Sequence, residues 1–484
     1  MCSVAVWLAL LLLPLFLPAT QQHKENRMTE IERLKETFRK NRSTFEADLS
    51  QFIAFQTVSA DPAFLPHFTA CSKWLKAKLQ AMGAEVEIWN EEGRPIIFAS
   101  LPSTKKDAPT LLLYNHYDVQ PVDPIQEWQS DPFTLVVEGD ILRARGTTDD
   151  KGPCLFTLSA VKELIKKELP FNIKILLEGE EEIASGSLIK YCEIKKEALK
   201  ADYAMIIDLG MREKDVPAIP IGTRGVATLS LSLQGANQDL HSGSYGGMAP
   251  NPLQAISELI ARLHNDDGSV AVPGFYDSVH MPSEQERAAL SLHMDETEWE
   301  KEFGQPPVAG EQQFLPLERA GLRPTLEING IGGGYTGPGI KTVIPREVKA
   351  KISCRLVPGQ DPQTVAEKVQ TFLHANTPKG TSLDVEILKG RGMAFRAQTD
   401  SETFLAVEKA MGEVWGGKPE RIIEGGSVPI IPVLQEASQS KLLLWGITLP
   451  SDRMHAPNEN VSFEQLERGF LTLSLAIAFL ANLE

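Results

Sequence analysis

The sequence is poor in cysteine, and the few cysteines it has form no metal-binding or redox motif. The chain of 484 residues contains Cys2, Cys71, Cys154, Cys192 and Cys354. No two of them are separated by only two residues, which argues against a cysteine-bound metal or a dithiol redox site. Their scatter over a long chain predicts free, buried thiols rather than a disulfide framework.

The sequence also lacks an excess of positive charge. It has 48 lysine and arginine residues against 64 aspartate and glutamate residues, which gives a formal net charge of -16 and a pI of about 5.2. An acidic surface repels phosphate backbones, so we expect no nucleic acid partner. Internal repeats are absent too, which argues against a solenoid, and the length favours two or three domains.

The N-terminal apolar run, residues 4–17, lacks the lysine or arginine that usually precedes the core of a signal peptide. Its length nevertheless fits a signal peptide better than a membrane span. Met28 opens an amphipathic helical pattern, which fits an alternative start of the chain. Residues 1–27 are therefore a signal-like segment or a misassigned start, and export and a cytoplasmic location both stay open.

Strands alternate with helices over the first part of the chain. Apolar runs predict five strands, at 86–89, 96–99, 110–114, 173–177 and 203–207. Helical patterns occupy 29–55 and 71–82, and a further helix is expected from Pro153, its first residue, to Glu168. This alternation predicts an α/β fold with a buried, mostly parallel sheet.

The pattern changes near Gly222. Strands are predicted at 226–234, 325–329, 348–357 and 383–388, with helices at 252–263 and 362–373. The resulting order β-α-β-β-α-β predicts a small ferredoxin-like layer. The α/β pattern then resumes and closes with a helix after Ser462, where Gln465 is expected to complete a capping box. We predict one α/β domain, residues 28–221 and 393–484, interrupted by an inserted α+β domain, residues 222–392.

Histidine and carboxylate residues follow the predicted strands of the first domain. His116 follows the third strand, Glu181 and Glu182 follow the fourth, and Asp208 follows the fifth. Asp149 lies just before the helix that joins the third and fourth strands. Because ligands bind beyond the carboxyl ends of strands in an open parallel sheet, these five side chains should converge on one rim.

This set of donors suits metal ions. Imidazole and carboxylate without cysteine fit Zn²⁺ or Mn²⁺. The carboxylates are too many for one tetrahedral ion, so we expect two ions about 3.5–4 Å apart with a shared carboxylate. Each residue alone has an ordinary alternative: His116 in a hydrogen-bonded loop, Asp208 in a turn, Asp149 as a helix cap. Their joint occurrence at the strand ends favours the metal site.

Eight stretches of the sequence resemble the dinuclear zinc metallopeptidases, the family of aminoacylase, acetylornithine deacetylase, succinyl-diaminopimelate desuccinylase and the carnosine dipeptidases. They are YNHYDVQP, RGTTDDKGP, EGEEEIASGS, DLHSGSYGG, GIKTVIPREV, SCRLVPGQDP, EGGSVPI and MHAPNE. The resemblance covers nearly all of residues 30–484 and is closest to the carnosine-type, cytosolic nonspecific dipeptidase branch. It implies a zinc-peptidase catalytic domain whose inserted domain serves as a lid and for dimerisation.

The resemblance implies a role for each residue of the metal site. Asp149 matches the ligand that bridges two ions. His116 and Asp208 match the remaining ligands of one ion, and Glu182 and His455 match those of the other.

The resemblance also implies the catalytic base. Glu181 matches the residue that takes a proton from the water between the ions, and Asp118 matches the carboxylate that orients the histidine two residues before it. Two positions depart from the family pattern. Ala184 stands where a glycine is usual, which predicts a longer or reshaped loop. Asp150 follows Asp149 directly, which leaves open which of the two carboxylates bridges.

Substrate-binding residues are implied in the same way. His241 matches a lid histidine that stabilises the oxyanion in the active site of the partner subunit, although a capped glycine-rich turn would also explain it. Thr342 and Arg355 match residues that hold the terminal carboxylate of the substrate. The alternative for Arg355 is a solvated cation on the open face of an alternating strand. Gly426 and Ser427 match a loop beside the metal site.

Together these features predict a metallo-dipeptidase that forms a homodimer and binds two Zn²⁺ per subunit, or Mn²⁺ in their place. The main alternative is an N-acyl amino acid deacylase of the acetylornithine deacetylase or desuccinylase type, which shares the metal residues. A non-enzymatic, metal-binding relative is a second alternative, and the presence of Glu181 argues against it. The matches at His241, Thr342 and Arg355 favour the dipeptidase.

Overall fold

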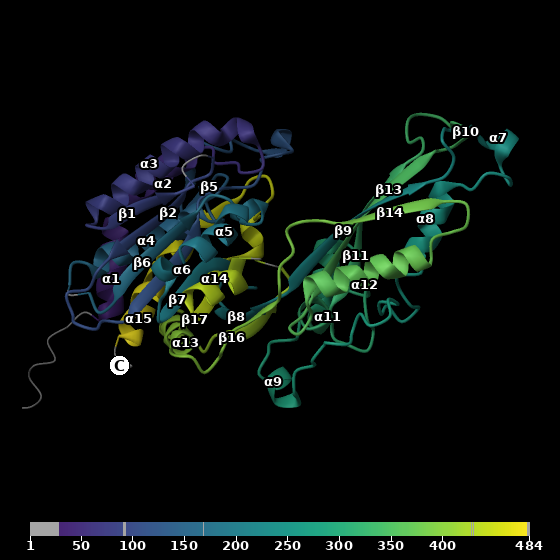
Figure 1. The fold of residues 1–484 in the computed structure, drawn as a ribbon. Coiled ribbons are helices and arrows are strands. Elements are labelled where there is room, and N and C mark those ends of the chain that lie inside the picture. The colour runs from purple at the N-terminus through teal and green to yellow at the C-terminus, as the bar shows by residue number, and fades with distance from the viewer. Residues whose placement is uncertain (1–28, 91–92, 168, 427, 429, 482–484) are drawn as a thin grey trace, which may run out of the picture.

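The computed structural model describes residues 29–481 except 91–92, 168, 427 and 429. The chain forms a larger lobe from its two ends and a smaller lobe from its middle (Figure 1). The N-terminal segment of residues 1–27 lies outside the described residues, and so does Ser427. Among the helices that the structure describes, none combines the length and apolar composition needed to cross a membrane.

A six-stranded sheet forms the centre of the larger lobe, in the order β1-β2-β6-β3-β7-β17. The last four strands in this order run parallel to one another, whereas β1 and β2 are antiparallel to their neighbours. The predicted mostly parallel sheet is thus confirmed. The strands are β1 (Glu85–Trp89), β2 (Ile96–Leu101), β3 (Thr110–His116), β6 (Asn172–Glu178), β7 (Tyr203–Gly210) and β17 (Lys441–Thr448).

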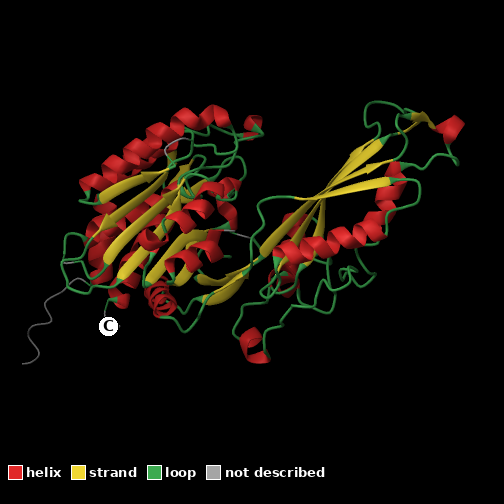
Figure 2. Ribbon diagram, viewed as in Figure 1, coloured by secondary structure: helices red, strands yellow, loops and turns green. Residues whose placement is uncertain are grey.

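Helices cover both faces of this sheet (Figure 2). In β3, Leu111 and Leu113 pack into the core on one face, and Leu112 and Tyr114 pack into the core on the other. Because both faces are buried, the strand is apolar without alternation from Leu111 to Tyr114. The first face carries α1 (Glu30–Lys40), α2 (Arg42–Ala54), α3 (Leu65–Ala81), α4 (Lys151–Leu164), α13 (Glu402–Trp415) and α15 (Phe463–Leu480); the second carries α5 (Gly186–Ile194), α6 (Lys196–Leu199) and α14 (Ile430–Ser438).

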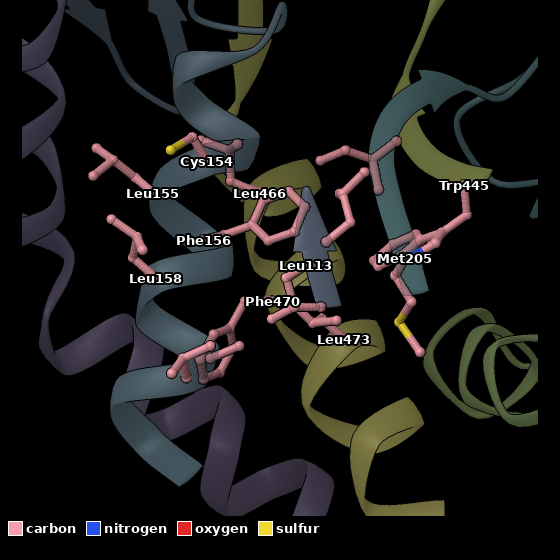
Figure 3. Close-up of a cluster of buried hydrophobic side chains, with 14 of the residues drawn as sticks. Leu113, Cys154, Leu155, Phe156, Leu158, Met205, Trp445, Leu466, Phe470 and Leu473 are labelled. Carbon is pink, nitrogen blue, oxygen red and sulfur yellow. The ribbon is translucent and has the colours of Figure 1, made fainter. Parts of the chain in front are cut away.

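Close packing of α4 on α15 fixes the position of the helix that follows the Asp149 loop. Phe156 of α4 lies against Trp445 of β17, with ring centroids 6.3 Å apart, and among leucines of α15 (Figure 3). Gly469 permits this arrangement, because a Cβ atom there would lie 2.6 Å from the Phe156 ring. The core therefore requires glycine at this helical position.

The smaller lobe has a four-stranded antiparallel sheet in the order β11-β13-β9-β14. Two helices, α8 and α12, pack on one face and enclose a separate core. The chain order β9-α8-β11-β13-α12-β14 is that of the predicted ferredoxin-like layer. The main elements are β9 (Gly225–Gln234), α8 (Pro252–Ala261), β11 (Thr325–Gly333), β13 (Glu347–Leu356), α12 (Pro362–Ala375) and β14 (Ser382–Ile387).

Short elements complete both lobes. The distal tip of the smaller lobe contains β10 (Leu240–His241), α7 (Ser242–Tyr245) and β12 (Val343–Ile344), and its connecting segments contain α9 (Glu284–Ala288), α10 (Glu296–Phe303) and α11 (Pro316–Gly321). Two small sheets add β8 (Ala218–Thr223), β15 (Phe395–Arg396) and β16 (Glu420–Glu424), and β4 (Val136–Glu138), β5 (Ile141–Arg143) and β18 (Asn460–Ser462).

Several details of the predicted elements were wrong, among them the start of α3, which begins at Leu65 and not at Cys71. The long N-terminal helix is divided at Asn41 into α1 and α2. Helix α4 begins at Lys151, two residues before Pro153. The side-chain oxygen of Ser462 accepts a hydrogen bond from the backbone of Gln465, but the Gln465 amide donates to the Asp452 carboxylate at 2.7 Å instead of returning to the cap.

Candidate metal centre and active-site cleft

Two groups of potential metal ligands lie side by side at one rim of the larger lobe. His116, Asp149 and Asp208 form one group, and Asp149, Glu182 and His455 form the other. Within each group the ligand atoms lie within 4.8 Å of one another. We call these five residues the metal-ligand cluster. Asp149 belongs to both groups, as the resemblance implied for a bridging ligand.

The parallel sheet brings the cluster together. His116 is the last residue of β3, Asp208 lies near the end of β7, and Glu182 lies in a single 3-10 turn that follows β6. The carboxyl ends of these parallel strands meet at one edge, as the sequence predicted. Asp149 and His455 come from loops, the first before α4 and the second after β17.

Asp149 lies between the two histidines. Its Oδ1 is 2.9 Å from Nε2 of His116, and its Oδ2 is 2.8 Å from Nε2 of His455. Asp150 is turned away, because its carboxylate accepts hydrogen bonds from the Asn115 side chain at 2.8 Å and from the His116 backbone at 3.0 Å. The structure therefore places Asp149, and not Asp150, between the two groups.

Asp118 contacts both His116 and the backbone of the turn that carries Glu182. Its carboxylate lies 3.4 Å from Nδ1 of His116 and accepts hydrogen bonds from the backbone N–H groups of Glu181 and Glu182, both at 3.1 Å. Nδ1 of His116 also faces the Asp118 carbonyl oxygen at 3.1 Å. These contacts hold Nε2 of the imidazole toward the cluster, which is the arrangement expected around a metal-binding histidine.

The position that departs from the family pattern has an unusual backbone conformation. Ala184 has φ +72° and Ser185 has φ +56°, so both lie in the left-handed region that glycine adopts most easily. The loop after Glu182 thus reaches a glycine-like shape without glycine.

Burial and neighbouring charges shift the pKa values of the cluster residues. Burial, reinforced by the charge of Asp149, raises the pKa of Glu182 to about 7, and burial also raises the pKa of Asp208. Burial opposes ionisation of Asp149 as well, but hydrogen bonds with His116 and His455 hold the pKa of this carboxyl below its usual range. Asp149 and Glu182 raise the pKa of His455 to about 10. Carboxylates and imidazoles without thiolates fit divalent Zn²⁺ or Mn²⁺ as ligands.

A cleft of about 660 Å³ opens over the cluster. Glu181 lines it but belongs to neither ligand group of the described residues. Burial, followed by the charge of Asp208, raises the pKa of Glu181 well above its usual range, although His116 opposes the shift. The volume suits a small ligand. A carboxylate beside the ligands and open to the cleft can accept and return a proton.

The other predicted substrate residues lie apart from one another. Gly426 lines the cleft, and Ser427 is outside the described residues. Arg355 lies at the end of β13 that is nearer the cleft, where it pairs with Val226, a residue of the cleft wall. Thr342 precedes the far end of the same strand. One chain therefore does not bring Thr342 and Arg355 together.

His241 lies next to Thr342 at the distal tip of the smaller lobe (Figure 1, near β10). The Gly243 N–H donates to Nδ1 of His241 at 3.0 Å, and Nε2 lies 3.5 Å from the Thr342 hydroxyl. Because Nδ1 accepts a hydrogen bond, the proton of the neutral ring is on Nε2. His241 can therefore act as a donor, but it does not reach the cleft of its own chain.

Sequence reasoning missed several polar residues of the site, among them Thr448 and Arg453 of the cleft wall. The Gln120 amide donates to Oε2 of Glu182 at 2.7 Å, and Glu424 lines the cleft at the end of β16. Gln120 and Glu424 lie inside stretches that carry the family resemblance, YNHYDVQP and EGGSVPI. Nothing in their residue type or strand position singled them out.

Comparison with known proteins agrees with this geometry. The family model described as Peptidase family M20/M25/M40 matches residues 112–478. The Beta-Ala-His dipeptidase of Rattus norvegicus is 32% identical over 376 residues, which cover 76% of each chain. The Cys-Gly metallodipeptidase dug1 of Schizosaccharomyces pombe is 29% identical over 467 residues, covering 91% of this chain and 96% of the relative.

A solved structure extends the comparison to the whole fold. The M20 family metallo-carboxypeptidase Sso-CP2 from Sulfolobus solfataricus superposes with a TM-score of 0.79 at 31% identity, covering 89% of this chain and 98% of that one. Sequence, fold and the two ligand groups thus agree, and the chain belongs to the peptidase family M20/M25/M40.

Proposed function

We propose that this protein is a metal-dependent dipeptidase. The observation that carries the proposal is the pair of ligand groups that share Asp149 at the floor of an open cleft, with Glu181 beside them. Two relatives that cover at least three quarters of the chain are named as dipeptidases, Beta-Ala-His dipeptidase and Cys-Gly metallodipeptidase. We further propose two Zn²⁺ per subunit as the native cofactor, with Mn²⁺ as the alternative.

The residues of the cleft have different roles in amide hydrolysis. The metal-ligand cluster would hold two divalent ions, which would supply polarisation of the scissile carbonyl and acidification of the attacking water. Glu181 takes the proton of that water and returns it to the leaving amine. Asp118 keeps His116 and the Glu181–Glu182 backbone in place during this transfer.

Positive charge at the near end of the smaller lobe supports recognition of a free carboxylate. Burial, followed by the charge of Arg355, lowers the pKa of Arg224 to about 10. Arg224 also donates from Nε to the Gly425 carbonyl at 3.0 Å, beside the cleft. Arg355 can therefore bind the C-terminal carboxylate with two parallel hydrogen bonds. Such a contact limits how many residues fit between the scissile bond and the C-terminus.

The remaining groups point to a second copy of the chain. His241 and Thr342 lie too far from their own cleft to touch substrate. Apolar side chains near them in the sequence are exposed: Tyr245, Met248 and Ile340 are 46%, 74% and 92% exposed. We propose that this tip covers the cleft of a partner subunit in a homodimer, where Nε2 of His241 donates to the developing oxyanion. Thr342 then joins Arg355 of the other chain at the substrate carboxylate.

A carboxypeptidase is the second candidate, because the Sulfolobus structure of similar fold and 31% identity is titled a metallo-carboxypeptidase. It shares the need for a free C-terminus but accepts a longer peptide before the scissile bond. The deacylase alternative finds no support among these relatives, which are peptidases.

A substrate panel separates the candidates. Zn²⁺- or Mn²⁺-loaded protein is incubated with dipeptides, tetrapeptides, acetylornithine and succinyl-diaminopimelate, and the products are identified by mass spectrometry. Preference for dipeptides supports the proposal, while stepwise shortening of tetrapeptides indicates a carboxypeptidase. Turnover of the acylated compounds alone would identify a deacylase.

A further inference from the structure

A buried ion pair lies behind the metal-ligand cluster without belonging to it. Nη1 of Arg145 is 2.7 Å from Oε2 of Glu459, and the exposed fractions of the two side chains are 1% and 0%. Isolating two charges from water is costly unless their remaining polar atoms are also satisfied. The contacts of this pair therefore indicate what it does.

The Glu459 carboxylate organises the loop that carries Asp149. It accepts hydrogen bonds from the backbone N–H groups of Gly146 and Thr148, each at 3.0 Å, and of Asp149 at 3.2 Å. The Glu459 carbonyl oxygen also accepts from the Ala144 N–H at 3.1 Å. One residue thus binds four backbone groups of the segment that ends at Asp149.

The same residue belongs to the loop that carries His455. Glu459 follows His455 by four residues, and the intervening Asn458 fastens the loop on its other side. The Asn458 side chain accepts from the Gln129 N–H at 2.8 Å and donates to the Glu127 carbonyl at 2.9 Å. Glu459 therefore connects the two cluster residues that lie on loops, Asp149 and His455.

Arg145 extends the connection to a third segment. Its Nη2 donates to the Pro121 carbonyl at 3.0 Å, and its guanidinium lies over the Trp128 ring, 5.4 Å from the centroid. Pro121 follows β3 in the loop whose Gln120 hydrogen bonds to Glu182. The pair thus joins three segments: the loop before Asp149, the loop after His455, and the loop after β3 whose Gln120 contacts Glu182.

We propose that Arg145 and Glu459 are positioning residues that set the separation of Asp149 and His455 and thereby the metal affinity of the group formed with Glu182. The other group depends less on them, because His116 and Asp208 lie on strands of the central sheet and Asp118 orients the histidine. The inference rests on the proposed metal centre, and it predicts unequal effects on the two ions.

The test is a metal titration of Glu459→Gln by calorimetry, with Zn²⁺ and Mn²⁺ as probes, together with metal analysis after dialysis. Glutamine keeps the shape of the side chain, but its NH2 group faces N–H donors and cannot pair with Arg145. We expect the group of Asp149, Glu182 and His455 to lose affinity roughly 10–100-fold, the usual effect of removing an outer partner of a metal site. The group of His116, Asp149 and Asp208 should lose less, although Asp149 belongs to both groups. Hydrolysis should recover toward the wild-type kcat as the metal concentration rises.

Glu311→Gln is the matched control. Glu311 forms a buried two-bond pair with Arg323 in the smaller lobe, with distances of 2.6 and 2.8 Å. It should lower the melting temperature and leave both metal affinities unchanged. If Glu459→Gln does not fold, Arg145→Lys replaces it, because lysine keeps the charge and cannot reach both Glu459 and Pro121.

Three results would contradict the inference in different ways. Wild-type affinity at both sites of a folded variant would show that the pair does not position ligands. Equal weakening at both sites with a lower melting temperature would make the pair a general stabiliser of the lobe. A wild-type protein that binds no divalent ion would overturn the proposed function itself.

Discussion

Two inactive variants of this chain, His241→Ala and Glu181→Gln, should restore activity to each other when their subunits mix. The reason is the length of β13. Its near end, at Arg355, pairs with Val226 of the cleft wall, and its far end, at Glu347, pairs with Gln234. At about 3.3 Å per residue, the eight steps between Glu347 and Arg355 span roughly 26 Å, and His241 lies beyond the far end.

The expected magnitude follows from dimer statistics. Loss of the general base should reduce turnover by about 10²–10⁴-fold, and loss of an oxyanion donor by about 10²–10³-fold. Each homodimer is then nearly inactive. After random exchange of equal amounts, half the dimers are mixed, and one of the two clefts in each has both groups intact. Activity should therefore recover to about a quarter of the wild-type value.

The assay uses two affinity tags, so that mixed dimers can be purified through both. Purified mixed dimers should have about half the specific activity of the wild type, since one of two clefts is complete. Mixed dimers no more active than their parents would show that His241 does not act across the interface. A His241→Ala homodimer with wild-type turnover would remove His241 from the mechanism altogether.

The remaining predictions concern metal, substrate and core. Chelation should abolish hydrolysis and Zn²⁺ or Mn²⁺ should restore it; full activity in chelator, with no bound divalent ion by metal analysis, would contradict the metal centre. Arg355→Lys should lower kcat/KM for free dipeptides, with a loss of about 1–3 kcal/mol of transition-state stabilisation. Dipeptides amidated at the C-terminus should be poor substrates of both the wild type and the variant. Asp118→Asn should weaken metal binding roughly 10–100-fold in a calorimetric titration, because an amide NH2 would face the Glu181 or Glu182 N–H. Gly469→Ala should destabilise the larger lobe by about 1–3 kcal/mol in denaturant unfolding, because its Cβ would meet the Phe156 ring at 2.6 Å; unchanged stability would mean that the ring can move aside.

The sequence was sufficient to predict the rim on which the cluster lies. His116, Glu182 and Asp208 each lie near or beyond the end of a mostly apolar strand, and such strands form a sheet buried on both faces. The carboxyl ends of parallel strands meet at one edge, so residues far apart in the chain become neighbours for a reason visible in the sequence. His455 was found only through the family resemblance, because it lies seven residues beyond the end of β17 in a loop with no periodic pattern.

Only the tertiary structure shows which of two neighbouring carboxylates faces the other ligands. It also shows that Thr342 and Arg355 of one chain lie too far apart to share an active site. Asp149 and Asp150 are equivalent in sequence, but Asn115 and the His116 backbone occupy the carboxylate of Asp150 and leave Asp149 facing the cluster. Thr342 and Arg355 are thirteen positions apart, and an extended strand turns that short interval into a separation that one active site cannot span. Local patterns determine which residues form strands and where those strands end. Side-chain direction and the distance between lobes depend on contacts between segments distant in the sequence, so they appear only once the chain is folded.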